Sequence, residues 1–170
     1  MKLQSAKEWT EVLTPWISVA ALILGGVFAI QQYFEKKNDD RIKETMNFLD
    51  RYNKPPFSAA HDQIETAWER NAKAEEKCRA AADCAANFNV FLLEVIEKES
   101  MRSSIFVIVD FYSSLAACVD EGICDKAISK RFFRDEAAAY FRRHYPLIIQ
   151  ERDAQNNKKF GMGLQSIAEL

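Results

Sequence analysis

Histidine, glycine and proline are scarce in this chain, and each scarcity removes a class of function or fold. The only histidines are His61 and His144, so catalysis or metal binding through histidine has few candidates. Glycine occurs five times and proline four times, which is too few for a turn-rich β fold. The sequence contains no Ser-His-Asp or Cys-His arrangement and no nucleotide-binding glycine motif. We therefore expect that the protein is not an enzyme, and we predict no catalytic residue, no cofactor and no metal ligand.

A strong excess of either charge is also missing. The formal net charge of −2 gives no general attraction to phosphates, so we expect no nucleic-acid partner. Ala, Glu, Lys, Phe and Ile are frequent, and this composition favours helices over strands. A length of 170 residues allows one membrane anchor and one modest domain. These features predict an all-α protein.

One long stretch, residues 12–34, contains no charged residue and no histidine. A helix of this length rises about 1.5 Å per residue and covers roughly 34 Å, enough to cross a hydrocarbon core of about 30 Å. Trp9 and Trp16 lie near one end, and Tyr33 and Phe34 near the other, as expected at two membrane interfaces. The stretch therefore predicts a single transmembrane helix near the N-terminus.

Two other interpretations of this stretch are less favourable. A cleaved signal peptide would place Val27 and Ala29 before the cleavage site, but the leader is only weakly basic and contains Glu8 and Glu11. A buried core helix is rarely so long and so uniformly uncharged.

Small residues recur four apart on one face of the predicted span. They are Ala21, Gly25 and Ala29. Such spacing lets a second helix approach closely, although small residues are frequent in membrane helices in any case. We expect membrane lipid as one partner, and another membrane protein or a second copy of this chain as the other.

The rest of the chain predicts a charged stalk followed by a small soluble helical bundle. Along the stalk, one stripe is formed by Ile42, Met46, Leu49 and Asn53, with Phe48 and Tyr52 beside it, so we expect the helix to continue beyond the membrane. The expected parts are an interfacial lead-in (1–11), the transmembrane helix (12–34), the stalk helix (35–54), the bundle (55–153) and a polar tail (154–170). The end of this tail, residues 160–170, is expected to be either a short docking helix or disordered.

Helix breaks and caps divide the predicted bundle. Pro55 and Pro56 end the stalk, and Ser58 is expected to cap a helix that runs to about Ala74. Residues 77–87 have no strong apolar face and predict a loop or a frayed helix end.

Two dense apolar runs, 88–96 and 101–119, predict core helices. In the second, Ser103, Asp110, Ser114 and Ala117 define one face, on which Asp110 is expected to be solvated. Gly122 is expected to end that helix, and Asp125 to cap the next. Two further helices are predicted at 126–133 and 135–149. Their inward residues should be Ala127, Ile128, Phe132, Ala138, Phe141, Tyr145 and Ile148.

Four cysteines form two pairs with the same spacing: Cys78 and Cys84, then Cys118 and Cys124. In an oxidising compartment an even count in loop-like segments suggests two disulfides, either local or crossed. In a reducing compartment the same residues serve as small buried hydrophobes. A four-thiolate zinc site is the third alternative, but it usually uses Cys-x-x-Cys spacing.

A basic run follows the second cysteine pair. It comprises Lys126, Lys130, Arg131, Arg134, Arg142 and Arg143. Such a run can attract anionic headgroups or an acidic partner, but it is more often the solvated side of amphipathic helices.

Two signals disagree about the side of the membrane that holds the C-terminal domain. Lys36, Lys37, Arg41 and Lys43 follow the span, and this excess of basic residues favours the cytoplasm. The paired cysteines favour the opposite, oxidising side. The sequence gives slightly more weight to the cytoplasmic placement, in a bacterial inner membrane.

The stalk RIKETMNFLDRYN and the later stretch VDFYSSLAACVDEGICDKAISKRFF resemble a loose group of uncharacterised bacterial proteins. Members of this group have one N-terminal membrane helix, a charged stalk and a small all-helical domain, and the resemblance transfers no activity. We therefore expect a membrane-anchored interaction protein, an accessory or stabilising subunit of a larger membrane complex. The alternative is a membrane-tethered sensor or effector that uses its cysteine pairs as a redox or metal switch.

Overall fold

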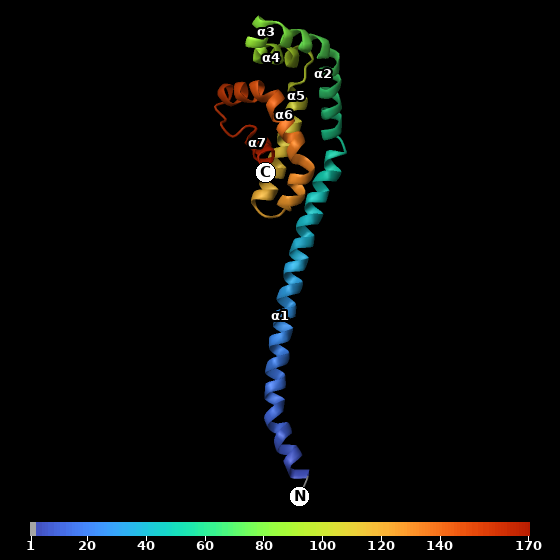
Figure 1. Ribbon diagram of the computed structural model, residues 1–170, viewed down its shortest axis with the longest axis vertical. Helices are drawn as coiled ribbons and strands as arrows, with labels where there is room; N and C mark the ends of the chain where they lie inside the picture. The colour runs from blue at the N-terminus through green and yellow to red at the C-terminus, as the bar shows by residue number, and fades with distance from the viewer. Residues whose placement is uncertain (1–2) are drawn as a thin grey trace. The chain divides into compact units, whose positions relative to one another are not determined.

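A computed structural model describes the backbone of residues 3–170 and the side chains of residues 21–170. The side chains of the predicted lead-in (1–11), with Trp9, and of Trp16 lie outside the described residues. Within 3–170 the chain forms seven helices and no strand, which confirms the all-α prediction (Figure 1). Contacts within the chain divide it into two units, residues 1–40 and residues 41–170. We call the second the helical unit.

The first helix, α1 (Leu3–Tyr52), crosses from one unit into the other. Every residue from 21 to 40 is exposed. From residue 41 onward one face is buried, with Thr45 at 1% and Phe48 at 5% exposure. The Phe48 ring packs edge-on against Phe111, with 5.7 Å between ring centroids. The helical unit thus begins before the predicted bundle boundary at residue 55.

Six further helices complete the helical unit. They are α2 (Phe57–Ala80), α3 (Ala82–Ala86), α4 (Phe88–Lys98), α5 (Arg102–Asp120), α6 (Lys126–Ala154) and α7 (Met162–Ala168). Helix α5 packs against α2, α6 and α7, and α4 packs against α2 and α6. The core therefore surrounds α5.

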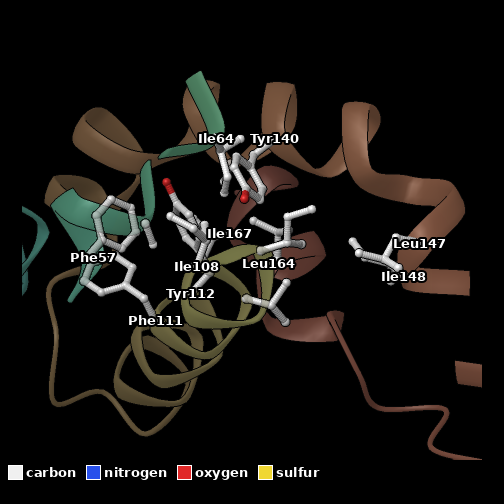
Figure 2. Close-up of a cluster of buried hydrophobic side chains, with 14 of the residues drawn as sticks. Phe57, Ile64, Ile108, Phe111, Tyr112, Tyr140, Leu147, Ile148, Leu164 and Ile167 are labelled. Carbon is white, nitrogen blue, oxygen red and sulfur yellow. The ribbon is translucent and has the colours of Figure 1, made fainter. Parts of the chain in front are cut away.

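Aromatic and branched side chains fill this core. Figure 2 shows Phe57 of α2 beside Phe111 of α5, and the two ring centroids lie 4.5 Å apart. Ile108 and Tyr112, also on α5, are 1% and 0% exposed. Such tilted aromatic pairs add about 0.5–1.5 kcal/mol beyond the burial of their area. The end of α1 packs on the same cluster through Tyr52, whose ring lies 4.5 Å from that of Phe57.

The connection between α5 and α6 follows the sequence prediction. Gly122 adopts a positive φ of 66° just after the end of α5. The backbone N–H of Ile123 donates to the carbonyl of Cys118, and that of Gly122 donates to Val119, which completes a Schellman-type helix end. Asp125 then accepts a hydrogen bond of 2.8 Å from the backbone N–H of Ile128 and caps α6.

Several predicted helix limits are wrong. Helix α2 begins at Phe57 and has no side-chain cap, so Ser58 is not its N-cap. It continues past Ala74 to Ala80, and residues 82–86 form α3, so most of 77–87 is helical. The alanines of this segment have high intrinsic helix propensity. The helix forms there although it buries little surface.

The two helices predicted at 126–133 and 135–149 are one helix, α6, which passes through Pro146. Their predicted inward face is also shifted. The buried residues are Ser129, Phe133, Ala137, Tyr140, His144, Leu147, Ile148 and Glu151. Phe132 and Tyr145, expected inside, are each 45% exposed. The buried stripe includes three polar residues, which a hydrophobic pattern does not select. In α1, Met46 and Asn53 are likewise exposed, because Thr45 and Phe48 form the buried face.

Residues 154–159 of the predicted polar tail are exposed, but the end of the tail is part of the core. Leu164 and Ile167 of α7 are 0% exposed and pack with α5 and α6. The approach to α5 is close at Gly163, where an added Cβ would lie 2.4 Å from the Cα of Ser113. Glycine is therefore required at this contact, and the docking-helix alternative for 160–170 describes the structure.

Candidate functional site

The most unusual surface among the described residues is the first part of α1. Eight large apolar side chains between residues 22 and 34 are 59–76% exposed. They are Leu22, Ile23, Leu24, Val27, Phe28, Ile30, Tyr33 and Phe34. A soluble protein rarely leaves so many contiguous apolar side chains in water. We call residues 21–34 the apolar segment.

The predicted small-residue face lies within the apolar segment. Ala21, Gly25 and Ala29 are all exposed. A Cβ added at Gly25 or at Gly26 would meet no atom within 4 Å. Space for a second helix is therefore open along this face, and the presence of such a helix stays a prediction.

Among the described residues, one helix is long and apolar enough to span a membrane, and it is α5. Half of the most apolar stretch of α5 is buried inside the protein. Its exposed side carries Ser103, Asp110, Ser114 and Ala117, as the sequence predicts. Helix α5 is the central helix of the core, and its apolar character has that explanation.

The four cysteines form two local disulfides rather than crossed ones. Cys78 is joined to Cys84 and Cys118 to Cys124, with Cα–Cα distances of 5.0 and 5.1 Å. The first bond links the end of α2 to α3, and the second closes the turn between α5 and α6. Within residues 21–170, no group of three or more His, Cys, Asp or Glu side chains is placed to hold a metal ion.

The second disulfide closes a loop that is bonded to α1. The backbone N–H of Asp125 donates to Thr45 Oγ1 at 2.7 Å, and the Thr45 hydroxyl donates to the carbonyl of Arg41 at 2.9 Å. Cys124 is fully buried and Thr45 is 1% exposed. Thr45 therefore connects the start of α6 to α1 inside the helical unit. No sequence motif marks this contact, because the two residues are 80 positions apart.

The predicted basic run does not form one patch of free charges. Lys126, Lys130 and Arg131 are exposed near the start of α6. Arg134 forms an ion pair with Asp135 at 2.8 Å. Arg142 is exposed, whereas Arg143 reaches Glu75 of α2 at 2.7 Å. The run therefore divides into a solvated beginning and a later part that meets other helices.

The later part lines a hollow of about 520 Å³ between α2, α4 and α6, which we call the arginine hollow. Glu75, Arg79, Phe88, Asn89, Leu92, Ala139, Arg142 and Arg143 line it. Glu75 accepts hydrogen bonds from both Arg79 and Arg143. Burial alone would raise the pKa of Glu75, but these two arginines bring it below its usual value.

His144, one of the two histidines, is a structural residue. It is 1% exposed, and its Nδ1 donates to the carbonyl of Tyr140 at 2.9 Å. Its Nε2 accepts from Trp68 Nε1 at 3.3 Å. Both ring nitrogens are thus satisfied in the neutral form, and burial lowers the pKa of His144 to about 4.

The other histidine lies in a polar contact at the end of α1. The Tyr52 hydroxyl donates to Glu136 at 2.6 Å, and His61 Nε2 lies 3.5 Å from the same carboxylate. Burial, together with this hydrogen bond, raises the pKa of Tyr52. The arrangement joins α1, α2 and α6.

A second hollow, of about 360 Å³, lies where α1 turns into α2. Phe57 and Phe111 form its floor, and Arg51, Lys54 and Asp110 lie at its rim. Lys54 is already paired with Asp50 at 2.6 Å. Positive and negative side chains therefore largely balance at this hollow.

Sequence comparison identifies the family. The family model described as "Domain of unknown function (DUF4760)" matches residues 17–169. The chain belongs to this family. No curated protein and no solved structure matches the chain. The DUF4760 match begins inside the predicted transmembrane stretch and ends one residue after α7, so the family region includes the apolar segment and all but the last residue of the helical unit. It confirms the expected relationship to an uncharacterised family, and it carries no activity.

Proposed function

We propose that this DUF4760 protein is a single-pass membrane-anchored interaction protein. Its helical unit would dock on a larger membrane complex as an accessory or stabilising subunit. The observation that carries the proposal is the exposure of the whole apolar segment, from Ala21 to Phe34. Burying one large apolar side chain is worth about 1.5–3 kcal/mol. A lipid environment would supply this burial for the segment on every side.

The helical unit supports the second part of the proposal. It has its own core, from Phe48 on α1 to Ile167 on α7. Its polar contacts, such as those of His144 and Glu136, link helices to one another. A folded unit held at a membrane and built in this way is suited to binding a partner.

Substitutions on the small-residue face test whether the partner contacts the membrane helix. Gly25→Leu would fill this face, while Gly26→Leu adds the same side chain about 100° around the helix. We expect Gly25→Leu to lose the partner on purification from native membranes in mild detergent, and Gly26→Leu to retain it. Gel filtration of the purified parent protein shows whether a partner protein elutes with it. A lone monomer with no co-purifying protein contradicts the proposal.

The side of the membrane is proposed from the cysteines. All four are joined in disulfides, and such bonds persist in oxidising compartments. We therefore place the helical unit on the oxidising side, against the placement predicted from the basic residues after the span. Alkylation of intact cells without reductant, followed by reduction and a second label, measures the redox state. Four thiols that take up the first, membrane-permeant label contradict this placement.

A redox switch is the second candidate function, and the Thr45 contact favours it. Reduction of Cys118–Cys124 would loosen the loop that carries Asp125, whose N–H is bonded to α1. Partner binding should then differ between oxidised and reduced protein. Equal partner recovery with and without reductant excludes the switch and leaves the anchored interaction protein intact.

A further inference from the structure

The arginine hollow carries more positive charge than its own residues neutralise. Three guanidinium groups and one carboxylate line it, which leaves a surplus of two positive charges. Arg142 is exposed and forms no ion pair with any residue that the structure describes. Such a surplus inside a concave surface concentrates anions.

Two of the three guanidinium groups are held in place. Arg79 lies over the Phe88 ring at 4.1 Å from its centroid, and Arg143 lies over the Trp68 ring at 4.3 Å. The carboxylate of Glu75 bridges both groups. Stacking and pairing reduce the side-chain entropy that an anion would otherwise have to remove on binding. The pair is thus preorganised for a ligand.

Donor capacity remains after these internal contacts. A guanidinium group has five N–H donors. Glu75 accepts two hydrogen bonds from Arg79 and one from Arg143. The remaining donors of both groups, together with all those of Arg142, suit the oxygens of an anion in the hollow.

We propose that the arginine hollow binds the dianionic phosphate group of a phosphomonoester. A dianion matches the surplus of two charges, whereas a single carboxylate would neutralise half of it. The volume of about 520 Å³ exceeds that of one phosphate group, so it accommodates part of an organic body as well. Leu92 and Ala139 supply an apolar surface for that body. The inference is independent of membrane anchoring.

Calorimetric titration of the full chain in an uncharged detergent tests the site, with phenyl phosphate as the probe and benzoate as the monoanionic comparison. We expect saturable binding of phenyl phosphate and binding of benzoate that is about tenfold weaker. Between pH 7.5 and pH 5 the affinity for phenyl phosphate should fall several-fold, because the second phosphate pKa is about 6.

Arg142 is the most suitable position for a test substitution, because it makes no ion pair with any described residue and its loss breaks no internal contact of that kind. Arg142→Gln should weaken phenyl phosphate binding about tenfold, and Arg142→Glu should abolish it. Arg131→Gln removes the same charge from an exposed position of α6 outside the hollow, and it should bind like the parent protein. Thermal unfolding of each variant confirms that it is folded.

Three results would overturn the proposal. They are the absence of saturable phenyl phosphate binding, equal affinity for benzoate, and equal losses in Arg142→Gln and Arg131→Gln. Nanodiscs identify the source of the phosphate once binding is seen. If phosphatidate in a neutral bilayer competes with phenyl phosphate, the ligand is a lipid headgroup; if it does not compete, the ligand is a soluble phosphomonoester.

Discussion

The two parts of helix α1 have the same backbone conformation and opposite relations to their surroundings. Residues 21–34 are exposed and, apart from Gln31 and Gln32, apolar, whereas residues 41–52 are mainly polar and bury one face through Thr45 and Phe48. Burial inside a protein follows periodicity, which the second part has and the first lacks. The comparison indicates that a helix without a polar face is suited to an apolar environment such as the interior of a lipid bilayer.

Matched phenylalanine truncations should give the largest difference between the two parts of the chain. Phe57 is 3% exposed and touches Tyr52 and Phe111, while Phe28 is 61% exposed. We expect Phe57→Ala to lower the unfolding free energy of the helical unit by about 3–5 kcal/mol. Phe28→Ala should leave it unchanged. Denaturant unfolding of the full chain in detergent measures both, and equal losses would contradict the separation into two units.

The helical unit should also lose stability in mild acid through His144. Its folded pKa of about 4 lies below the usual 6.5, so the unfolded chain binds more protons between these values. Stability is therefore complete above about pH 6.5 and falls as the pH decreases toward 4, by up to about 3 kcal/mol. His144→Gln should flatten this interval of the pH–stability curve. An unchanged slope in that variant would assign the pH dependence to other groups.

Glycine substitutions sharpen the comparison at the level of single contacts. Gly163→Ala places a Cβ 2.4 Å from the Cα of Ser113, so α7 must move away from α5. We expect a loss of about 1–3 kcal/mol. Gly25→Ala meets no atom within 4 Å and should cost the helical unit nothing. Thermal unfolding compares the two, and a stable Gly163→Ala protein would show that α7 does not dock as described.

The smallest expected effect is at the contact between α1 and the start of α6. Thr45→Val keeps the shape of the side chain and removes the acceptor for the Asp125 N–H. We expect a loss of about 1 kcal/mol, and Thr45→Ser should recover most of it because it retains the hydroxyl. Hydrogen exchange of the Asp125 amide gives a local readout. Equal exchange in the parent, Val and Ser proteins would contradict the bond.

Local chemistry accounts for what the sequence predicted correctly. The cap at Asp125, the helix end at Gly122 and the exposed face of α5 with Asp110 each depend on residues within a few positions. The apolar run of 12–34 is equally local, and its assignment to a transmembrane helix stays a prediction. These features can be predicted from a single sequence because they do not depend on residues far along the chain.

The features that the sequence did not predict depend on contacts between residues that are far apart in the chain. The inward face of α6 contains Ser129, His144 and Glu151, and their burial depends on partners far along the chain, such as Trp68. Leu164 and Ile167 alone gave little sign that α7 completes the core. Of the residues that line the arginine hollow, Arg142 and Arg143 belong to the basic run found in the sequence. Glu75, which is 68 residues from Arg143, could not be assigned to the same site by spacing.

Flotation with phospholipid vesicles after an alkaline carbonate wash tests the central claim most directly. The full chain, prepared without detergent, should remain with the vesicles, because the apolar segment would lie within the bilayer and not at its surface. Recovery of a monodisperse protein in the aqueous fraction, free of lipid and detergent, would contradict the account.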